Sequence, residues 1–146
     1  MPVWSVGYEG HTPESFLALL QRAGVNALAD VRERPQSRKK GFGKRSLEAF
    51  LLEHGIGYVH LKDLGAPADV RHEYHATHDT DAFRAAYRHH LDGQRVALDQ
   101  LESLAQRRRT AMMCLEQDAS ECHRRVLAER LREDGVEVIE LQDEQQ

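Results

Sequence analysis

The sequence predicts an α/β fold, a three-layer sandwich with a mainly parallel sheet of about five strands and helices on both faces. Short apolar segments rich in strand formers alternate with segments whose apolar residues recur at helical spacing. Such alternation is typical of a parallel sheet covered by helices. The 146 residues contain no repeat and no low-complexity linker. We therefore expect a single domain over residues 1–146, with a polar tail from about residue 142.

The first half of the chain is predicted to run strand, helix, strand, helix, strand. Thr12 and Pro13 are typical of the cap and the first residue of a helix, and Gly24 is typical of its end. Ser46 is predicted to cap the second helix, and Gly55 to end it. The three strands are expected at residues 3–7, 27–31 and 56–61.

The second half is predicted to contain a long loop, three helices and two strands. Residues 65–80 lack apolar periodicity. We interpret them as a mobile flap rather than a metal site, although His72, His75 and His78 recur every three residues. Helices are expected around residues 83–93 and 97–105 and after Glu116, and strands at 111–115 and 136–141.

The composition limits the compartment and the partners. The N-terminal residues lack the basic and apolar regions of a signal peptide, and no segment has the length and apolarity of a membrane span. Two cysteines are too few for a disulfide framework, so we expect a cytoplasmic protein with reduced thiols and no membrane association. A net charge of −4 argues against polyanion binding over the whole surface.

Polar side chains follow four of the predicted strands. The carboxyl ends of parallel strands lie at one edge of the sheet, where α/β proteins bind their ligands. Strand ends also become polar simply because they meet water, and that alternative stays open for each residue taken alone. The side chains are Tyr8, Glu9 and His11 after the first strand, Asp30 and Arg32 at the second, His60 and Lys62 at the third, and Cys114 and Glu116 at the fourth.

The stretch MMCLEQDASECHRRVLAERL places reactive groups at the start of a helix. Cys122, His123 and Arg124 fall in the first turn, where free N–H groups and the helix dipole stabilise thiolates and attract anions. Cys122 is the candidate nucleophile. Glu116 is the natural partner of His123 or Arg124. The alternatives are a structural salt bridge and simple packing of the thiols, above all of Cys114 inside its strand.

A metal centre is not predicted from these residues. The chain has no C-x-x-C pair, and the adjacent Cys122 and His123 project about 100° apart on a helix. Ser120, not arginine, stands six positions after Cys114, which argues against a phosphatase-type cysteine loop. We expect neither a metal nor a cofactor, and a metal-dependent enzyme is the weakest alternative.

A strongly basic segment follows the second strand. From Arg32 to Arg45 there are seven basic residues and one acid, Glu33. Phe42 stands between two glycines within it. Arginines bind phosphates, and an aromatic ring can stack on a base, so the segment suits a phosphorylated ligand. The alternative is a solvated basic loop with Phe42 folded back over the core.

Several short motifs, in order, resemble the domain of unknown function 488 family from about Val3 to Leu131. They are GYEG at 7–10, GV at 24–25, DVR at 30–32, Pro35, SR at 37–38, GF at 41–42, GI-x-Y-x-H at 55–60, LG at 64–65, C-x-E at 114–116 and CHR at 122–124. Ala66 stands where that pattern has a second glycine. The resemblance implies a shared fold and one constellation but no established reaction. The implied members are Tyr8, Glu9, Asp30, Arg32, Ser37, Arg38, Tyr58, His60, Cys114, Glu116, Cys122, His123 and Arg124.

The leading hypothesis is an enzyme, a hydrolase or group transferase, that acts on a phosphorylated or nucleic-acid-derived substrate. The alternative is a non-catalytic module that binds nucleic acid or a nucleotide through the same arginines. The expected partners are therefore a phosphorylated small molecule or nucleic acid. The candidate catalytic residues are Glu116, Cys122, His123 and Glu9, and the candidate substrate-binding residues are Tyr8, Arg32, Ser37, Arg38, His60 and Arg124.

Overall fold

The computed structural model describes residues 2–114 and 123–142, and it contains one five-stranded sheet of order β3-β2-β4-β1-β5. Every neighbouring pair of strands is parallel. The register sets Gly7 opposite Cys114 and Asp30 opposite His60, so the carboxyl ends of four strands share one edge. The strands are β1 (Val3–Gly7), β2 (Ala27–Asp30), β3 (Gly57–His60), β4 (Thr110–Cys114) and β5 (Val138–Glu140).

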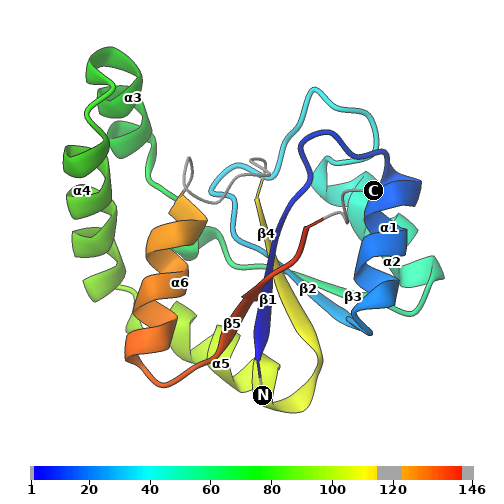
Figure 1. Cartoon of the computed structure of the whole chain (residues 1–146). Helices are drawn as coiled ribbons and strands as arrows, with labels where there is room; N and C mark the ends of the chain where they lie inside the picture. Colours follow the sequence, from blue (N-terminus) through cyan, green and yellow to red (C-terminus); the bar gives the residue numbers. More distant parts are fainter. Residues whose placement is uncertain (1, 115–122, 143–146) are drawn as a thin grey trace.

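Two helices, α1 (Pro13–Arg22) and α2 (Lys44–Glu53), cover one face of the sheet (Figure 1). The strand residues that face them include Trp4, Leu28 and Met113. Thr12 caps α1 as predicted, since its hydroxyl oxygen accepts a hydrogen bond from the Ser15 N–H.

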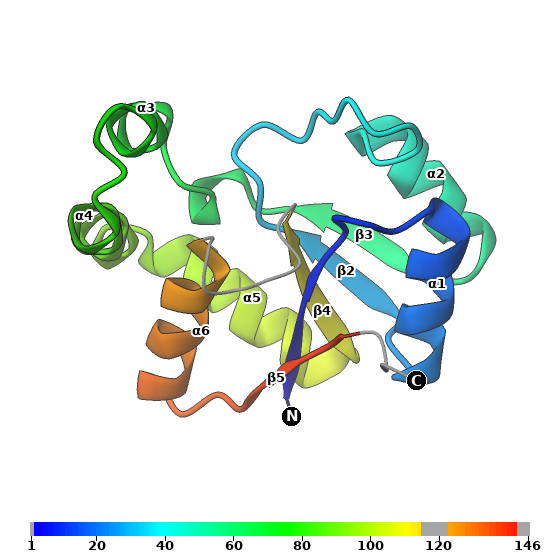
Figure 2. The ribbon, with the colours of Figure 1, turned by 45° about the horizontal axis from the view of Figure 1, so that its top comes forward.

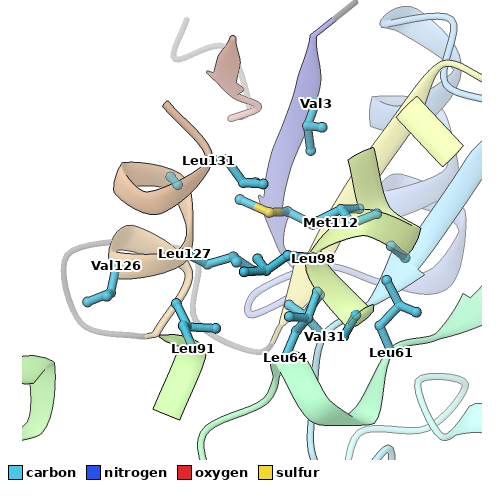
Figure 3. Packing of buried hydrophobic residues seen from close by; sticks show 14 of the residues in the cluster. Val3, Val31, Leu61, Leu64, Leu91, Leu98, Met112, Val126, Leu127 and Leu131 are labelled. Carbon is cyan, nitrogen blue, oxygen red and sulfur yellow. The ribbon is translucent and has the colours of Figure 1, made fainter. Parts of the chain in front are cut away.

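The other face is covered by α5 (Arg95–Arg107) and α6 (His123–Glu133), and α4 (Thr80–Asp92) packs on the outer side of α6. Figure 3 shows the core on this side, in which Val3 and Met112 of the sheet, and Val31 directly after β2, lie among leucines that come mainly from the helices. Successive strand residues alternate between the two cores, and both sides are buried. This explains why the strands read as short apolar runs, and it confirms the predicted parallel three-layer fold.

A helix, not a loop, fills much of the segment predicted to be a flap. A short 3₁₀ helix, η1 (Lys62–Leu64), leads to α3 (Ala68–Thr77), which stands beside α4 at one end of the molecule (Figure 2). The loop prediction for residues 65–80 is therefore wrong. The physical reason is that α3 buries no residue completely, so it has no apolar stripe by which the sequence could reveal it. Tyr74 of α3 rests on Phe83 of α4, with ring centroids 5.1 Å apart.

The start of α2 also differs from the prediction. Gly43, not Ser46, is the N-cap residue, and the helix begins at Lys44. The Lys44 N–H donates to the Pro35 carbonyl over 2.9 Å, so the basic segment closes on itself before the helix begins. Among the helices that the structure describes, none has the length and apolar character needed to cross a membrane.

Candidate active site

A pocket of about 290 Å³ opens at the carboxyl edge of the sheet. Its lining comes from the ends of β1 and β4, from the segment after β2, from the η1–α3 region and from the first residue of α6. The lining residues are Tyr8, Arg32, Glu33, Arg34, Gln36, Ala66, Arg71, Cys114 and His123. The predicted convergence of strand ends therefore produces a real hollow.

A buried ion pair forms one wall of the pocket. Arg32 Nε and Nη2 donate to the two carboxylate oxygens of Asp30 over 2.8 and 2.6 Å. The two side chains are 7% and 0% exposed. Burial alone would lower the pKa of Arg32, but hydrogen bonding and the charge of Asp30 outweigh it and raise the pKa above its ordinary value. Arg32 is therefore a permanent cation whose position is fixed by two bonds.

Two tyrosines complete this wall. Tyr58 donates to Asp30 Oδ2 over 2.5 Å. Burial, and then this hydrogen bond, raise the pKa of Tyr58 above its usual value, so the phenol remains a neutral donor. Tyr8 donates to Ser37 Oγ over 3.1 Å and accepts a bond from Arg32 Nη1 over 3.3 Å.

Phe42 supports the wall from inside the core. Its ring is 0% exposed and stacks on Tyr8 with a centroid distance of 4.5 Å. Its carbonyl accepts a bond from Arg32 Nη1 over 2.7 Å. The suggestion that Phe42 stacks on a ligand base is therefore wrong, because the ring is already used to hold the basic segment against the fold.

Cys114 lies where β4 meets α6. The sulfur accepts a hydrogen bond from Arg124 Nε over 2.9 Å. Arg124 Nη1 also donates to Ser5 Oγ over 2.6 Å and to Glu140 Oε1 over 3.1 Å. Arg124 and Cys114 are each 1% exposed. A guanidinium in this position stabilises negative charge on a cysteine sulfur.

His123 borders the same pocket and is neutral. Burial lowers its pKa to about 4, although a hydrogen bond to the Val31 carbonyl acts in the opposite direction. His123 Nε2 lies 2.8 Å from that carbonyl oxygen. A carbonyl only accepts, so Nε2 carries the proton and Nδ1 is left with a lone pair. The rings of His123 and Tyr87 meet edge to face, with their centroids 5.2 Å apart, and this contact fixes the orientation of the imidazole.

Two further arginines line the mouth of the pocket. Arg71 of α3 donates to Glu33 Oε1 over 2.9 Å and to the Ala66 carbonyl over 2.7 Å. Arg34 is exposed. Neither was singled out from the sequence. Arg34 belongs to the basic segment that the sequence displays, so its role could have been suspected. Arg71 could not, because its position depends on α3, a helix that the apolar pattern did not reveal.

The predicted site residues that the structure describes divide into three groups. Tyr8, Arg32 and His123 line the pocket. Ser37, His60 and Arg124 contact residues that line it, His60 through a 2.6 Å bond between Nε2 and the Arg32 carbonyl. Glu9 and Arg38 are exposed and do not contribute to its lining.

Glu116 and Cys122 lie outside the described residues, and the roles assigned to all of these side chains stay predictions. Over residues 2–114 and 123–142, no cluster of three or more histidine, cysteine or acidic side chains is placed to hold a metal ion.

The fold and the pocket define a parallel α/β protein with a polar, arginine-lined hollow at the carboxyl edge of its sheet. The chain belongs to the family described as Domain of unknown function DUF488, whose model matches residues 12–131. This confirms the resemblance seen in the sequence motifs. Searches among curated proteins and solved structures gave no match.

Proposed function

We propose that the protein is an enzyme, a hydrolase or group transferase, that acts on a phosphorylated or nucleic-acid-derived substrate in this pocket. The observation that carries the proposal is the 2.9 Å contact between Arg124 Nε and the Cys114 sulfur, at a pocket whose charged lining is mainly arginine. A thiolate and an anion-binding surface side by side are the components of covalent catalysis on an anionic substrate.

Cys114 is the nucleophile that this geometry favours. It borders the pocket, and the adjacent guanidinium favours its anionic, reactive form. Cys122, the nucleophile favoured by the sequence, remains a second candidate. Cys114 lines the pocket and Arg124 does not, so Arg124 supports the thiolate and leaves substrate binding to other arginines.

Arg34 and Arg71 are the groups best placed to hold the substrate anion at the mouth. Arg71 is fixed by Glu33 and by the Ala66 carbonyl, while Arg34 is exposed and can turn toward a ligand. Arginine suits phosphate because its planar fork donates two parallel hydrogen bonds. His123 Nδ1, the unprotonated nitrogen, can accept a proton or a hydrogen bond from the substrate.

In the proposed reaction, Cys114 and His123 supply the nucleophile and the base, and no cofactor is needed. The Cys114 sulfur forms a bond to the electrophilic phosphorus or carbon while the bond to the leaving group breaks, and the leaving group departs with the electron pair. Water or a second acceptor then attacks the same atom and displaces the sulfur as thiolate. His123 Nδ1 takes the proton from that attacking group.

Selective alkylation tests the proposal. At pH 7 we expect iodoacetamide to modify Cys114 in the folded protein, located by mass spectrometry, and inorganic pyrophosphate to slow the reaction. Arg124→Gln should slow it as well, because the thiolate loses its cation. Cys122→Ser is the matched control and should leave the rate unchanged. If only Cys122 reacts, or if pyrophosphate has no effect, Cys114 is not the nucleophile of an anion-binding site.

A non-catalytic binding module is the second candidate function, and one observation favours it. Arg124 is bonded to Ser5 and Glu140 as well as to Cys114, which is how a purely structural arginine would be held. In that case, ligand affinity would fall steeply with salt and Cys114→Ser would leave it unchanged.

We further propose that residues 1–146 form a single domain of a cytoplasmic protein. Both cores are built on one sheet, which supports cooperative folding of the whole. The sequence contains only two cysteines, too few for a disulfide framework, which supports a reducing compartment. Coincident unfolding curves from Trp4 fluorescence and far-ultraviolet circular dichroism would test the first point, and fractionation of cells that express the protein would test the second.

A further inference from the structure

A second, larger hollow lies on the other side of the basic segment. It has a volume of about 550 Å³ and is bordered by the start of α1, by one side of α2 and by residues 39–41 of the basic segment. We call it the α1–α2 groove. The residues used below are Thr12, Pro13, Lys39, Lys40, Ser46 and Phe50. Glu14 is the acidic residue in its lining.

The surface around the α1–α2 groove is strongly basic. Arg38, Lys39, Lys40, Lys44 and Arg45 are all exposed. Within the part of the chain that the structure describes, none of these five side chains forms an ion pair. The chain as a whole carries a net charge of −4, so this positive region stands out against an acidic molecule. Such a region attracts a ligand with several negative charges.

An aromatic ring is available inside the same groove. Phe50 is only half-buried, and its ring lies 5.0 Å from that of His54, measured between centroids. The pairing of cations with a partly open aromatic side chain is the arrangement that binds single-stranded nucleic acids, because phosphates contact the cations and bases stack on the ring. A polyanion without flat bases would use the lysines but not Phe50.

A short stretch of the basic segment, residues 36–41, separates the groove from the pocket. Gln36 lines the pocket and Lys39 lines the groove, so their Cα atoms are at most about 11 Å apart. Gly41 has a φ of +91°, and a Cβ there would lie 2.5 Å from Pro13 Cγ, so this stretch is seated directly on α1. A ligand only a few nucleotides long can therefore reach both hollows.

We propose that the α1–α2 groove binds a segment of single-stranded nucleic acid that leads to the pocket lined by Cys114. The proposal rests on the proposed function only in naming the pocket as the place of reaction. Binding in the groove itself is independent of the thiol. Paired bases cannot stack on Phe50, so a duplex is expected to bind less tightly than a single strand.

Fluorescence anisotropy of a labelled oligothymidylate of about twelve nucleotides tests this inference. We expect wild-type affinity in the micromolar range at physiological salt. The Lys39→Ala/Lys40→Ala variant should bind at least about tenfold more weakly. Its plot of log affinity against log salt should be shallower by about 1.4, since each phosphate contact contributes about 0.7. Phe50→Leu should weaken binding about fivefold or more and leave that slope unchanged.

A charge-matched control removes Arg107 and Arg108, which lie at the opposite edge of the sheet, before β4. Arg107→Ala/Arg108→Ala should bind as the wild type does. Equal losses in both double variants, equal affinity for a duplex, or equally effective competition by polyglutamate would overturn the inference.

The Cys114→Ser variant separates this inference from the proposed function. Unchanged oligothymidylate binding by this variant supports the groove. If the thiol fails to react with iodoacetamide while the groove variants behave as expected, the enzyme proposal is wrong and the nucleic-acid groove stands. If the thiol reacts as expected but the lysine and Phe50 variants bind normally, the groove proposal is wrong.

Discussion

Asp30 accepts hydrogen bonds from two other side chains while being completely buried. Arg32 contacts both of its oxygens, and Tyr58 contacts one of them. A buried carboxylate of this kind is tolerated because its charge is matched within hydrogen-bond distance. Its effect is to fix the first residues of the basic segment, and with them one wall of the pocket.

Asp30→Asn is expected to destabilise the protein by about 3–5 kcal/mol, because it leaves the Arg32 guanidinium buried without a counter-charge. The free energy of unfolding in urea measures this. Glu33→Gln is the matched control: it breaks the half-exposed pair with Arg71 and should cost less than about 1 kcal/mol. Similar losses in the two variants would mean that Asp30 contributes no more than a surface acid.

His123 gives the protein a stability that depends on pH. Its pKa is about 4 in the folded protein and about 6.5 in an unfolded chain. As pH falls, the unfolded state takes up the proton first. The stabilising contribution is therefore complete above about pH 6.5 and is lost as pH falls toward 4.

Between pH 7 and pH 5, we expect the wild type to lose about 2 kcal/mol more stability than His123→Gln, which cannot titrate. Urea unfolding of both proteins at the two pH values gives this difference, and the remaining histidines cancel because both proteins contain them. A wild-type-minus-variant difference that does not change with pH would show that His123 titrates normally in the folded protein.

At the scale of elements, the turn after η1 is locked against the turn after β2. A Cβ on Gly65 would lie only 2.2 Å from the Glu33 backbone nitrogen and 2.7 Å from its Cα. No side chain can be accommodated at those distances without moving the backbone. The close approach sets the position of Ala66, and therefore of α3 and Arg71, relative to the pocket.

Gly65→Ala is expected to cost about 2 kcal/mol or more through overpacking against the backbone. The thermal unfolding midpoint would reveal it. Gly57→Ala, at the edge strand β3, is the control, since the nearest atom to its new Cβ is the Asn26 carbonyl oxygen at 3.9 Å. Gly57→Ala should leave the thermal unfolding midpoint unchanged. An equally tolerated Gly65→Ala would mean that the two turns are free to separate.

At the scale of the whole molecule, the sheet and most helices were predictable because they are buried in regular patterns. Residues such as Val3 and Met112 alternate with Trp4 and Met113 between two cores, and this double burial produces apolar runs that the sequence displays. The prediction for residues 65–80 was wrong because α3 has no fully buried residue, so no periodic apolar stripe is required.

The position of the candidate site at the carboxyl edge of the sheet was predictable, but the contacts of its individual side chains were not. The rule for parallel sheets brings Tyr8, Arg32 and His123 to one edge from the sequence alone. No sequence pattern distinguishes a cysteine that merely packs from Cys114, whose sulfur accepts a hydrogen bond from the Arg124 guanidinium of α6. The sequence likewise allowed Phe42 either to stack on a ligand or to cover the core, and only its packing against Tyr8 decides between the two.

Arg124 connects the Cys114 sulfur to β1 and to β5, the first and last strands of the sheet in chain order. Two of its other partners, Ser5 and Glu140, lie outside residues 12–131, the part that the family model matches. During evolution, the first and last strands are therefore not free to drift independently of the family's central motifs. Relatives that lose the acid at position 140 should carry compensating changes at position 5 or 124, and that covariation would be visible in an alignment that extends past the family's boundaries.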